Sequence, residues 1–155
     1  GTMPTHAEVR VINHSPEQLF DLIADVGRYP EFLPWCVDAR IRRREENLIV
    51  ADLVIGYRMF RERFTSTVTL SRPNRIDVSY SDGPFRYLNN HWIFIPEGAD
   101  SCTIDFFVDF EFHSRVLQLM VERVFGEAVK VMVRAFERRA DELFGSDVPP
   151  PEEIT

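Results

Sequence analysis

The chain contains little of what would assign it to a function class directly. Among its 155 residues there are only two cysteines, Cys36 and Cys102, and their spacing fits neither a zinc site nor a redox pair. We expect both to be buried, reduced thiols in a reducing compartment. The four histidines are scattered, and the sequence has no phosphate-binding loop and no G-x-S-x-G or H-E-x-x-H motif. It therefore carries no catalytic or metal-binding signature.

Basic charge and long apolar runs are also scarce. The net charge is −7, from 18 basic and 25 acidic residues, so a general phosphate binder is not expected. The one basic cluster consists of Arg40 and residues 42–44, all arginine. We interpret it as a solvated face paired with Glu45 and Glu46, with anionic lipid head groups or ribosomal RNA as alternative partners. Since no apolar run approaches the roughly 20 residues of a spanning helix, we expect a soluble protein whose membrane contact is peripheral.

Aromatic side chains, in contrast, are abundant. The chain has 13 Phe, 4 Tyr and 2 Trp, and its hydrophobic fraction of 45% excludes disorder as the default state. Aromatic residues bring the largest apolar area per residue. Either the rings fill the core, or some of them line a space for an apolar guest.

The N-terminal part predicts a strand followed by a short helix. Residues 6–13 alternate as a strand does. Residues 15–18, Ser-Pro-Glu-Gln, supply an N-cap, a proline at the first helical position and a capping-box partner. We expect the helix to continue through Val26 and to end at a left-handed Gly27. The two prolines within residues 29–35 then permit at most one helical turn.

The remainder predicts a sheet and one long helix. Residues 37–112 alternate between apolar and polar side chains over about six segments, which indicates antiparallel strands with one solvated face. Ser114 then caps a helix that reaches about Phe144 and ends at Gly145. The predicted fold class is therefore α+β: a curved antiparallel sheet of six to seven strands around a long C-terminal helix, with one or two short helices after strand 1.

We predict a single domain at residues 6–145. Residues 1–5 are interpreted as a cloning scar and native start, and residues 146–155 as a disordered, acidic, proline-rich tail. On the long helix we place Val121 and Val124 in the apolar stripe that faces the core, while Val116 and Leu119 fall off it. An exposed apolar patch there would indicate a partner, a dimer or a membrane. One helix cannot cover six or seven strands, so the rest of the sheet must be covered by rings, loops or a guest.

Three stretches of the sequence carry a resemblance to a known family. They are residues 29–36 (Tyr-Pro-Glu-Phe-Leu-Pro-Trp-Cys), residues 82–85 with Leu88, Trp92 and Phe94, and residues 108–112 with Ser114 and residues 135–136. In these stretches and in element order, residues 6–144 resemble the START-like, or helix-grip, superfamily. Within it they resemble the coenzyme Q-binding protein family, which is grouped with the bacterial ribosome-association toxin as polyketide cyclase-like.

The resemblance implies an internal hydrophobic cavity that binds a polyprenyl quinone such as ubiquinone, without catalysis and without a required cofactor. The protein would support quinone synthesis and cellular respiration as a carrier or chaperone. It would be cytoplasmic, in peripheral contact with the inner membrane or respiratory machinery, or on the matrix side of a mitochondrion. Nucleic acid is not expected except for the ribosome. The alternatives are a toxin-type protein on the large ribosomal subunit and a small cyclase-type enzyme; the oligomeric state stays open.

The candidate ligand-binding residues are large apolar side chains of the prolyl segment, the strands and the long helix, with two polar residues among them. They are Phe32, Leu33, Trp35, Phe60, Glu62, Phe64, Leu88, Asn90, Trp92, Phe94, Phe106, Phe110, Val121, Val124, Phe125, Ala128 and Met132. Each apolar residue has packing as its alternative role, and the prolyl segment forms either a lip at the cavity mouth or a plug of the core.

Three polar residues interrupt or flank these apolar faces. Glu62 would be costly to bury alone, so it lies near the sheet edge, pairs with an arginine or lines a wet pocket. Asn90 would donate a hydrogen bond to a quinone carbonyl. His91 is interpreted as a surface histidine, with an acid/base role beside Asp105 or Asp109 as the cyclase-type alternative.

Overall fold

The computed structural model describes residues 5–57 and 59–145, and the interpretations of residues 1–4 and 146–155 lie outside that part of the chain. The elements are β1 (Thr5–Ile12), α1 (Pro16–Ala24), the 3-10 helix η1 (Val26–Glu31), β2 (Cys36–Glu45), β3 (Leu48–Tyr57), β4 (Phe60–Ser71), β5 (Arg75–Ser81), β6 (Phe85–Pro96), β7 (Cys102–Phe112) and α2 (Arg115–Phe144). This order confirms the predicted α+β class.

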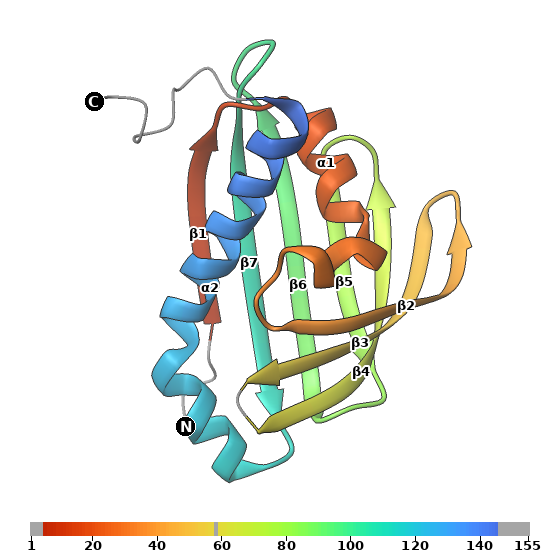
Figure 1. Ribbon diagram of the computed structural model, residues 1–155, viewed down its shortest axis with the longest axis vertical. Helices are drawn as coiled ribbons and strands as arrows, with labels where there is room; N and C mark the ends of the chain where they lie inside the picture. The colour runs from red at the N-terminus through yellow and green to blue at the C-terminus, as the bar shows by residue number, and fades with distance from the viewer. Residues whose placement is uncertain (1–4, 58, 146–155) are drawn as a thin grey trace.

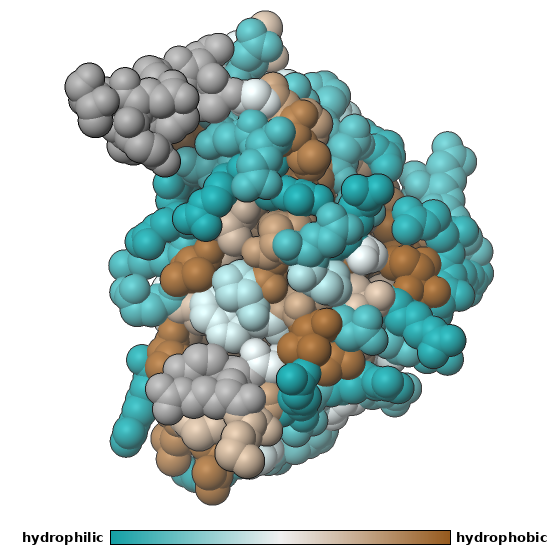
Figure 2. Space-filling model, viewed as in Figure 1, coloured by the Kyte–Doolittle hydropathy of each residue, from teal (hydrophilic) through white to brown (hydrophobic). Residues whose placement is uncertain are grey.

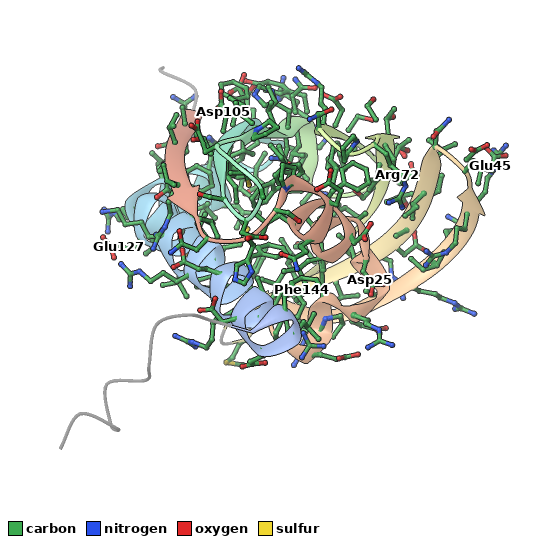
Figure 3. All side chains as sticks on the ribbon, turned by 90° about the horizontal axis from the view of Figure 1, so that it is seen from above. Asp25, Glu45, Arg72, Asp105, Glu127 and Phe144 are labelled. Atoms are coloured by element: carbon green, nitrogen blue, oxygen red, sulfur yellow. The ribbon has the colours of Figure 1, made fainter. Side chains whose placement is uncertain are left out.

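The seven strands form one antiparallel sheet in the order β1-β7-β6-β5-β4-β3-β2. Figure 1 shows α2 lying along the β1–β7 side of the sheet, with α1 and η1 on the same concave face. Seen from above, the sheet curves around the packed side chains, and α2 runs across its open side (Figure 3). Burial alternates strictly along β7, so the predicted apolar ladder from Cys102 to Phe112 faces inward.

The predicted capping box of α1 is present. The Ser15 hydroxyl accepts a hydrogen bond from the Gln18 backbone N–H at 3.2 Å, and the Gln18 side chain accepts one from the Ser15 backbone N–H at 3.1 Å. The predicted end of the helix was wrong. α1 ends at Ala24, and Gly27 lies inside η1 without a left-handed conformation.

The early end of α1 has a local cause. The Asp25 N–H bonds to the Leu22 carbonyl, three residues back, which tightens the chain into the 3-10 turn. The Tyr29 hydroxyl then donates to the Ile23 carbonyl, one of the last acceptors of α1. This bond holds η1 folded back against α1 and fixes where the following prolyl segment meets the sheet.

Helix α2 begins and ends as predicted. The Ser114 hydroxyl accepts from the Leu117 N–H at 3.2 Å, and Gly145 has a φ of 85° at the C-cap. The 30 residues correspond to a rod of roughly 45 Å. The buried or half-buried stripe runs along the helix at steps of three and four residues: Leu117, Val121, Phe125, Val129, Met132, Phe136 and Ala140.

The predicted place of Val124 in this stripe was wrong. One residue before Phe125, it is turned by 100° about the helix axis and is 46% exposed. Val116 and Leu119 lie off the stripe as predicted, 76% and 58% exposed, and Met120 joins them at 52%. The first half of α2 therefore presents apolar side chains outward, and Figure 2 shows hydrophobic atoms at the lower end of the molecule, where α2 begins.

Candidate ligand-binding cavity

A partly open cavity of about 260 Å³ lies between the sheet and α2. Its wall is almost entirely apolar and comes from α1, η1, the prolyl segment, β3 to β7 and α2: Ile23, Val26, Tyr29, Leu33, Trp35, Cys36, Leu53, Ile55, Phe64, Ser66, Val68, Ile76, Val78, Leu88, Asn90, Trp92, Phe106, Val108, Phe125, Val129, Met132 and Phe136. This is the space that one helix leaves uncovered on a seven-stranded sheet.

Two clusters of aromatic rings join the cavity wall to the core. In one, the Phe85 ring packs against Phe64 and Phe110 and stacks on Phe112 with centroids 4.6 Å apart. In the other, Phe136 of α2 contacts Trp92 at 5.4 Å and Tyr29 at the same distance. Phe64 belongs to the cavity wall in the first cluster, as do Trp92 and Phe136 in the second. The abundant rings thus both fill the core and line the cavity.

The volume decides what such a cavity holds. An engineered protein cavity of about 150 Å³ is large enough to bind benzene. At about 260 Å³, this cavity is large enough for a substituted six-membered ring with a short chain. It is too small for a complete polyprenyl tail, which would have to leave through the open side. In Figure 2, apolar side chains reach the surface between α2 and the β2–β4 region.

Nine of the candidate residues line this cavity: Leu33, Trp35, Phe64, Leu88, Asn90, Trp92, Phe106, Phe125 and Met132. The structure places the others elsewhere. Phe94 is buried and packs edge-on against Phe20, and Phe110 packs between Phe112 and Phe125. Phe60, Val121 and Ala128 are half-buried outside the cavity wall, and Val124 points away from it.

Phe32 lies outside the cavity and fastens η1 to α2. Its ring packs against Phe136 at 5.3 Å, and the Arg139 guanidinium lies 5.2 Å from its centroid. Arg139 also donates to Glu31 at 2.6 Å. Its neighbour Leu33 faces the cavity. Adjacent residues of the prolyl segment therefore differ: Phe32 packs on the helix and Leu33 lines the cavity.

Two neutral polar side chains belong to the wall formed by the sheet. The Asn90 amide N–H donates to the Phe107 carbonyl at 2.8 Å, which orients the side chain and leaves its second N–H and its oxygen for another partner. Ser66 is only 2% exposed. Our sequence reasoning did not select it, although a visible signal existed: Ser66 is the small polar residue in the apolar ladder between Phe64 and Val68.

The titratable groups of the wall are held in their neutral forms. Burial, followed by the nearby Cys36 and Asp25, raises the pKa of Tyr29. Burial, with a smaller contribution from Asp38, raises the pKa of the Cys36 thiol to about 11. Since the thiolate is the reactive form, Cys36 is a poor nucleophile at neutral pH.

The residues considered for acid/base chemistry are not part of the wall. His91 stacks on Phe107 with ring centroids 5.2 Å apart, and Glu62 is half-buried opposite Ile55 of β3. Neither belongs to the cavity lining, which contains no carboxylate and no histidine among the described residues. Over residues 5–57 and 59–145, no group of three or more His, Cys, Asp or Glu side chains could hold a metal ion. None of the helices in that part of the chain is long and apolar enough to cross a membrane.

Comparison with known proteins places these features in context. The sequence pattern of the family described as polyketide cyclase / dehydrase and lipid transport matches residues 12–137. Ribosome association toxin RatA of Vibrio cholerae is 35% identical over 135 residues, covering 87% of this chain and 94% of the relative. Coenzyme Q-binding protein COQ10 homolog B, mitochondrial, of Xenopus laevis is 33% identical over 149 residues, covering 94% of this chain and 61% of the relative.

Solved structures agree with the fold. The Zhui aromatase/cyclase from Streptomyces sp. R1128 superposes with a TM-score of 0.81 at 15% identity, covering 91% of this chain and 95% of the cyclase. At that identity the likeness shows the fold alone, and it confirms the predicted START-like architecture. The relatives above carry names with different functions, so the choice between them depends on the site itself.

Proposed function

The chain belongs to the polyketide cyclase / dehydrase and lipid transport family, and from this premise we propose that it binds a polyprenyl quinone in its cavity without transforming it. It would act as a carrier or chaperone that supports quinone synthesis and respiratory electron transport. The observation that carries the proposal is the open, apolar cavity between the sheet and α2, whose volume suits a substituted ring. A relative named as a coenzyme Q-binding protein supports the choice of ligand.

The energetics of transfer favour reversible binding. Moving a methylene from water into an apolar cavity gains about 0.8 kcal/mol, but a quinone tail starts in a bilayer that is already apolar. The net gain on leaving the membrane is therefore small, and the ring and its oxygens must provide the selectivity. A protein of this kind takes up its ligand and releases it again.

The size of the cavity indicates how the ligand would lie. The ring would enter and the tail would leave through the open side, remaining partly in the bilayer. The exposed apolar side chains of Val116, Leu119 and Met120, in the first half of α2, would then contact the membrane while the ligand is exchanged. Binding at the membrane surface removes the need to enclose the whole tail.

The composition of the wall supports binding over catalysis. A cyclase-type reaction needs a titratable acid or base at the substrate. The described lining offers only the Tyr29 hydroxyl, which is committed to the Ile23 carbonyl, and the Cys36 thiol, whose pKa is raised to about 11. At neutral pH both groups are uncharged, so neither serves as the acid or base of a cyclase-type reaction.

The protein contains its own probe for the proposed ligand. It has two tryptophans, Trp35 and Trp92, and both line the cavity. Titration with a ubiquinone that has a ten-carbon tail should quench their fluorescence with saturation. The single variants Trp35→Phe and Trp92→Phe should each lose part of the quenched signal. A titration that does not saturate, or phosphatidylcholine that copurifies and resists displacement by the quinone, would overturn the quinone proposal.

A second candidate function depends on a different surface. Relatives named ribosome association toxin are equally similar to this chain, and the edge strand β2 exposes Arg40 and Arg44. Their neighbours Arg42 and Arg43 are paired with Asp52 and Glu45. A ribosome-binding protein should cosediment with large ribosomal subunits at low salt, and the double variant Arg40→Glu/Arg44→Glu should lose this. Absence of cosedimentation at low salt would reject it.

A further inference from the structure

Ser66 is a nearly buried residue, 2% exposed, that brings a hydroxyl to the apolar wall of the cavity. Within the described part of the chain, no hydrogen bond joins its Oγ to another side chain, and the Oγ is not fully enclosed by protein, since the fully buried side-chain atoms without a partner are His6 Nε2, Glu8 Oε2, Glu137 Oε2 and Arg139 Nε. A buried hydroxyl is normally satisfied, because leaving it unpaired costs free energy. A donor that has no side-chain partner and faces an internal space indicates a partner that enters that space.

The surroundings of Ser66 explain why no other side chain pairs with it. In the sheet it stands between Ala51 of β3 and Tyr80 of β5, and Ala51 has no polar side-chain atom. The Tyr80 hydroxyl is committed to the carbonyls of Gly83 and Phe85. The preceding Thr65 faces the other side of the sheet, where its hydroxyl donates to Asp52 at 2.7 Å. Adjacent hydroxyls on β4 therefore differ: the outer one is paired with a side chain and the inner one is not.

The second polar group of the wall lies close to Ser66 in the register of the sheet. Asn90 on β6 is opposite Val78 of β5, and Val78 is opposite Val68 of β4, two residues from Ser66. Ser66 and Asn90 thus share the concave face, with β5 between them and an offset of one inward position. The other side chains of the sheet lining are apolar apart from the indole N–H of Trp92 and the thiol of Cys36.

We propose that Ser66 is a specificity-determining residue: its hydroxyl donates a hydrogen bond to a carbonyl oxygen on the ring of the bound lipid. Asn90 flanks the same ring from β6. The pair forms a polar subsite that selects lipids with hydrogen-bond acceptors on the ring over hydrocarbons of the same shape. This inference rests on the proposed function, because it concerns the head group of the ligand that occupies the cavity.

Selection by one hydroxyl is asymmetric, and that makes it testable. A ligand with an acceptor satisfies Ser66, whereas a hydrocarbon leaves it unpaired in a dry site. Removing the hydroxyl should therefore weaken the acceptor-bearing ligand and leave the hydrocarbon unchanged or slightly tighter. The hydrogen bond corresponds to roughly a three- to tenfold change in affinity.

The experiment compares two ligands of similar shape, a benzoquinone with a decyl tail and decylbenzene, on three variants. Ser66→Ala removes the donor, Ser66→Thr keeps it, and Ser71→Ala is a matched control at an exposed position of the same strand. Quinone binding is followed by tryptophan quenching, and decylbenzene binding is measured directly by isothermal titration calorimetry. The midpoint of urea unfolding is measured for each variant without ligand.

The expected result is that Ser66→Ala alone weakens the quinone by roughly three- to tenfold, with decylbenzene unaffected and the unfolding midpoint unchanged or raised. Ser66→Thr should bind the quinone like the wild type. Equal effects on both ligands, or none on either, would overturn the role of Ser66 while the cavity function stands. A lowered unfolding midpoint would show that Ser66 has a protein partner and would also overturn it. A wild type that binds decylbenzene but no quinone would overturn the proposed function itself.

Discussion

Enlarging one side chain in the cavity wall should show whether the space in front of it is a void or packed core. Val78 is half-buried at the centre of β5 and lines the cavity. The substitution Val78→Phe would place a ring in the space assigned to the ligand. If the space exists, the larger side chain becomes buried against apolar neighbours without displacing them.

The magnitude follows from the carbon atoms added. Phenylalanine adds the equivalent of three to four methylenes, which sets an upper limit of about 3 kcal/mol for burial at about 0.8 kcal/mol each. Overpacking a filled core costs about 1–3 kcal/mol instead. We therefore expect Val78→Phe to leave the free energy of unfolding unchanged or to raise it by up to about 2 kcal/mol. The quinone affinity should fall at least about tenfold, or 1.4 kcal/mol.

The matched control is the same substitution at a buried position outside the cavity. Val133 of α2 is 3% exposed and is not part of the cavity wall. Val133→Phe should lower the free energy of unfolding by about 1–3 kcal/mol. Urea unfolding measures both variants, and tryptophan quenching measures ligand binding. If Val78→Phe destabilises the protein as much as Val133→Phe does, or binds the quinone as the wild type does, the reasoning about the cavity is refuted.

Three other predictions concern the helix, the thiol and the membrane. Gly126→Ala should raise the free energy of unfolding by about 1 kcal/mol in urea, because the added Cβ meets no atom within 4 Å and alanine is the better helix former; a loss of stability would contradict this. The rate of Cys36 alkylation by iodoacetamide should rise with pH with a midpoint near the raised thiol pKa of about 11, and a midpoint near 9 would contradict burial. Because burial favours the neutral thiol in the folded state, the contribution of Cys36 to stability is present below pH 9 and is lost as the pH rises towards 11. The double variant Leu119→Glu/Met120→Glu should bind phosphatidylcholine–phosphatidylglycerol vesicles at least about tenfold more weakly at an unchanged urea midpoint, whereas equal binding would exclude this patch.

The architecture could be predicted from the sequence because its signals are local. The capping box of Ser15, the cap of Ser114 and the alternation along β7 each depend on a few adjacent residues. The end of α1 was not predicted, since it follows from the Asp25 N–H bonding to the Leu22 carbonyl, after which the Tyr29 hydroxyl reaches back to Ile23. A glycine at position 27 is permissive for a helix end but does not require one.

The candidate site could be predicted only in part, because sequence periodicity gives the face of an element and not the space in front of it. Phe94 and Trp92 share one strand, and both are buried. Phe94 meets Phe20 of α1, whereas Trp92 faces the cavity. The places where the helices cross the sheet decide which strand residues α1 covers and which face the cavity. Ser66 was missed because a serine in an apolar ladder marks a polar position on the inner face, while only the structure shows that this position lines the cavity.

The two candidate functions use surfaces that substitutions can separate. The cavity lies between α2 and the sheet, whereas Arg40 and Arg44 lie exposed on the edge strand β2. Val78→Phe changes the cavity and leaves those arginines in place. Arg40→Glu/Arg44→Glu changes the edge and leaves the cavity lining intact. If ribosome cosedimentation persists in the first variant and quinone binding persists in the second, the two activities are independent. If Val78→Phe removes both, occupancy of the cavity controls the outer surface, and lipid binding is the event on which ribosome association depends.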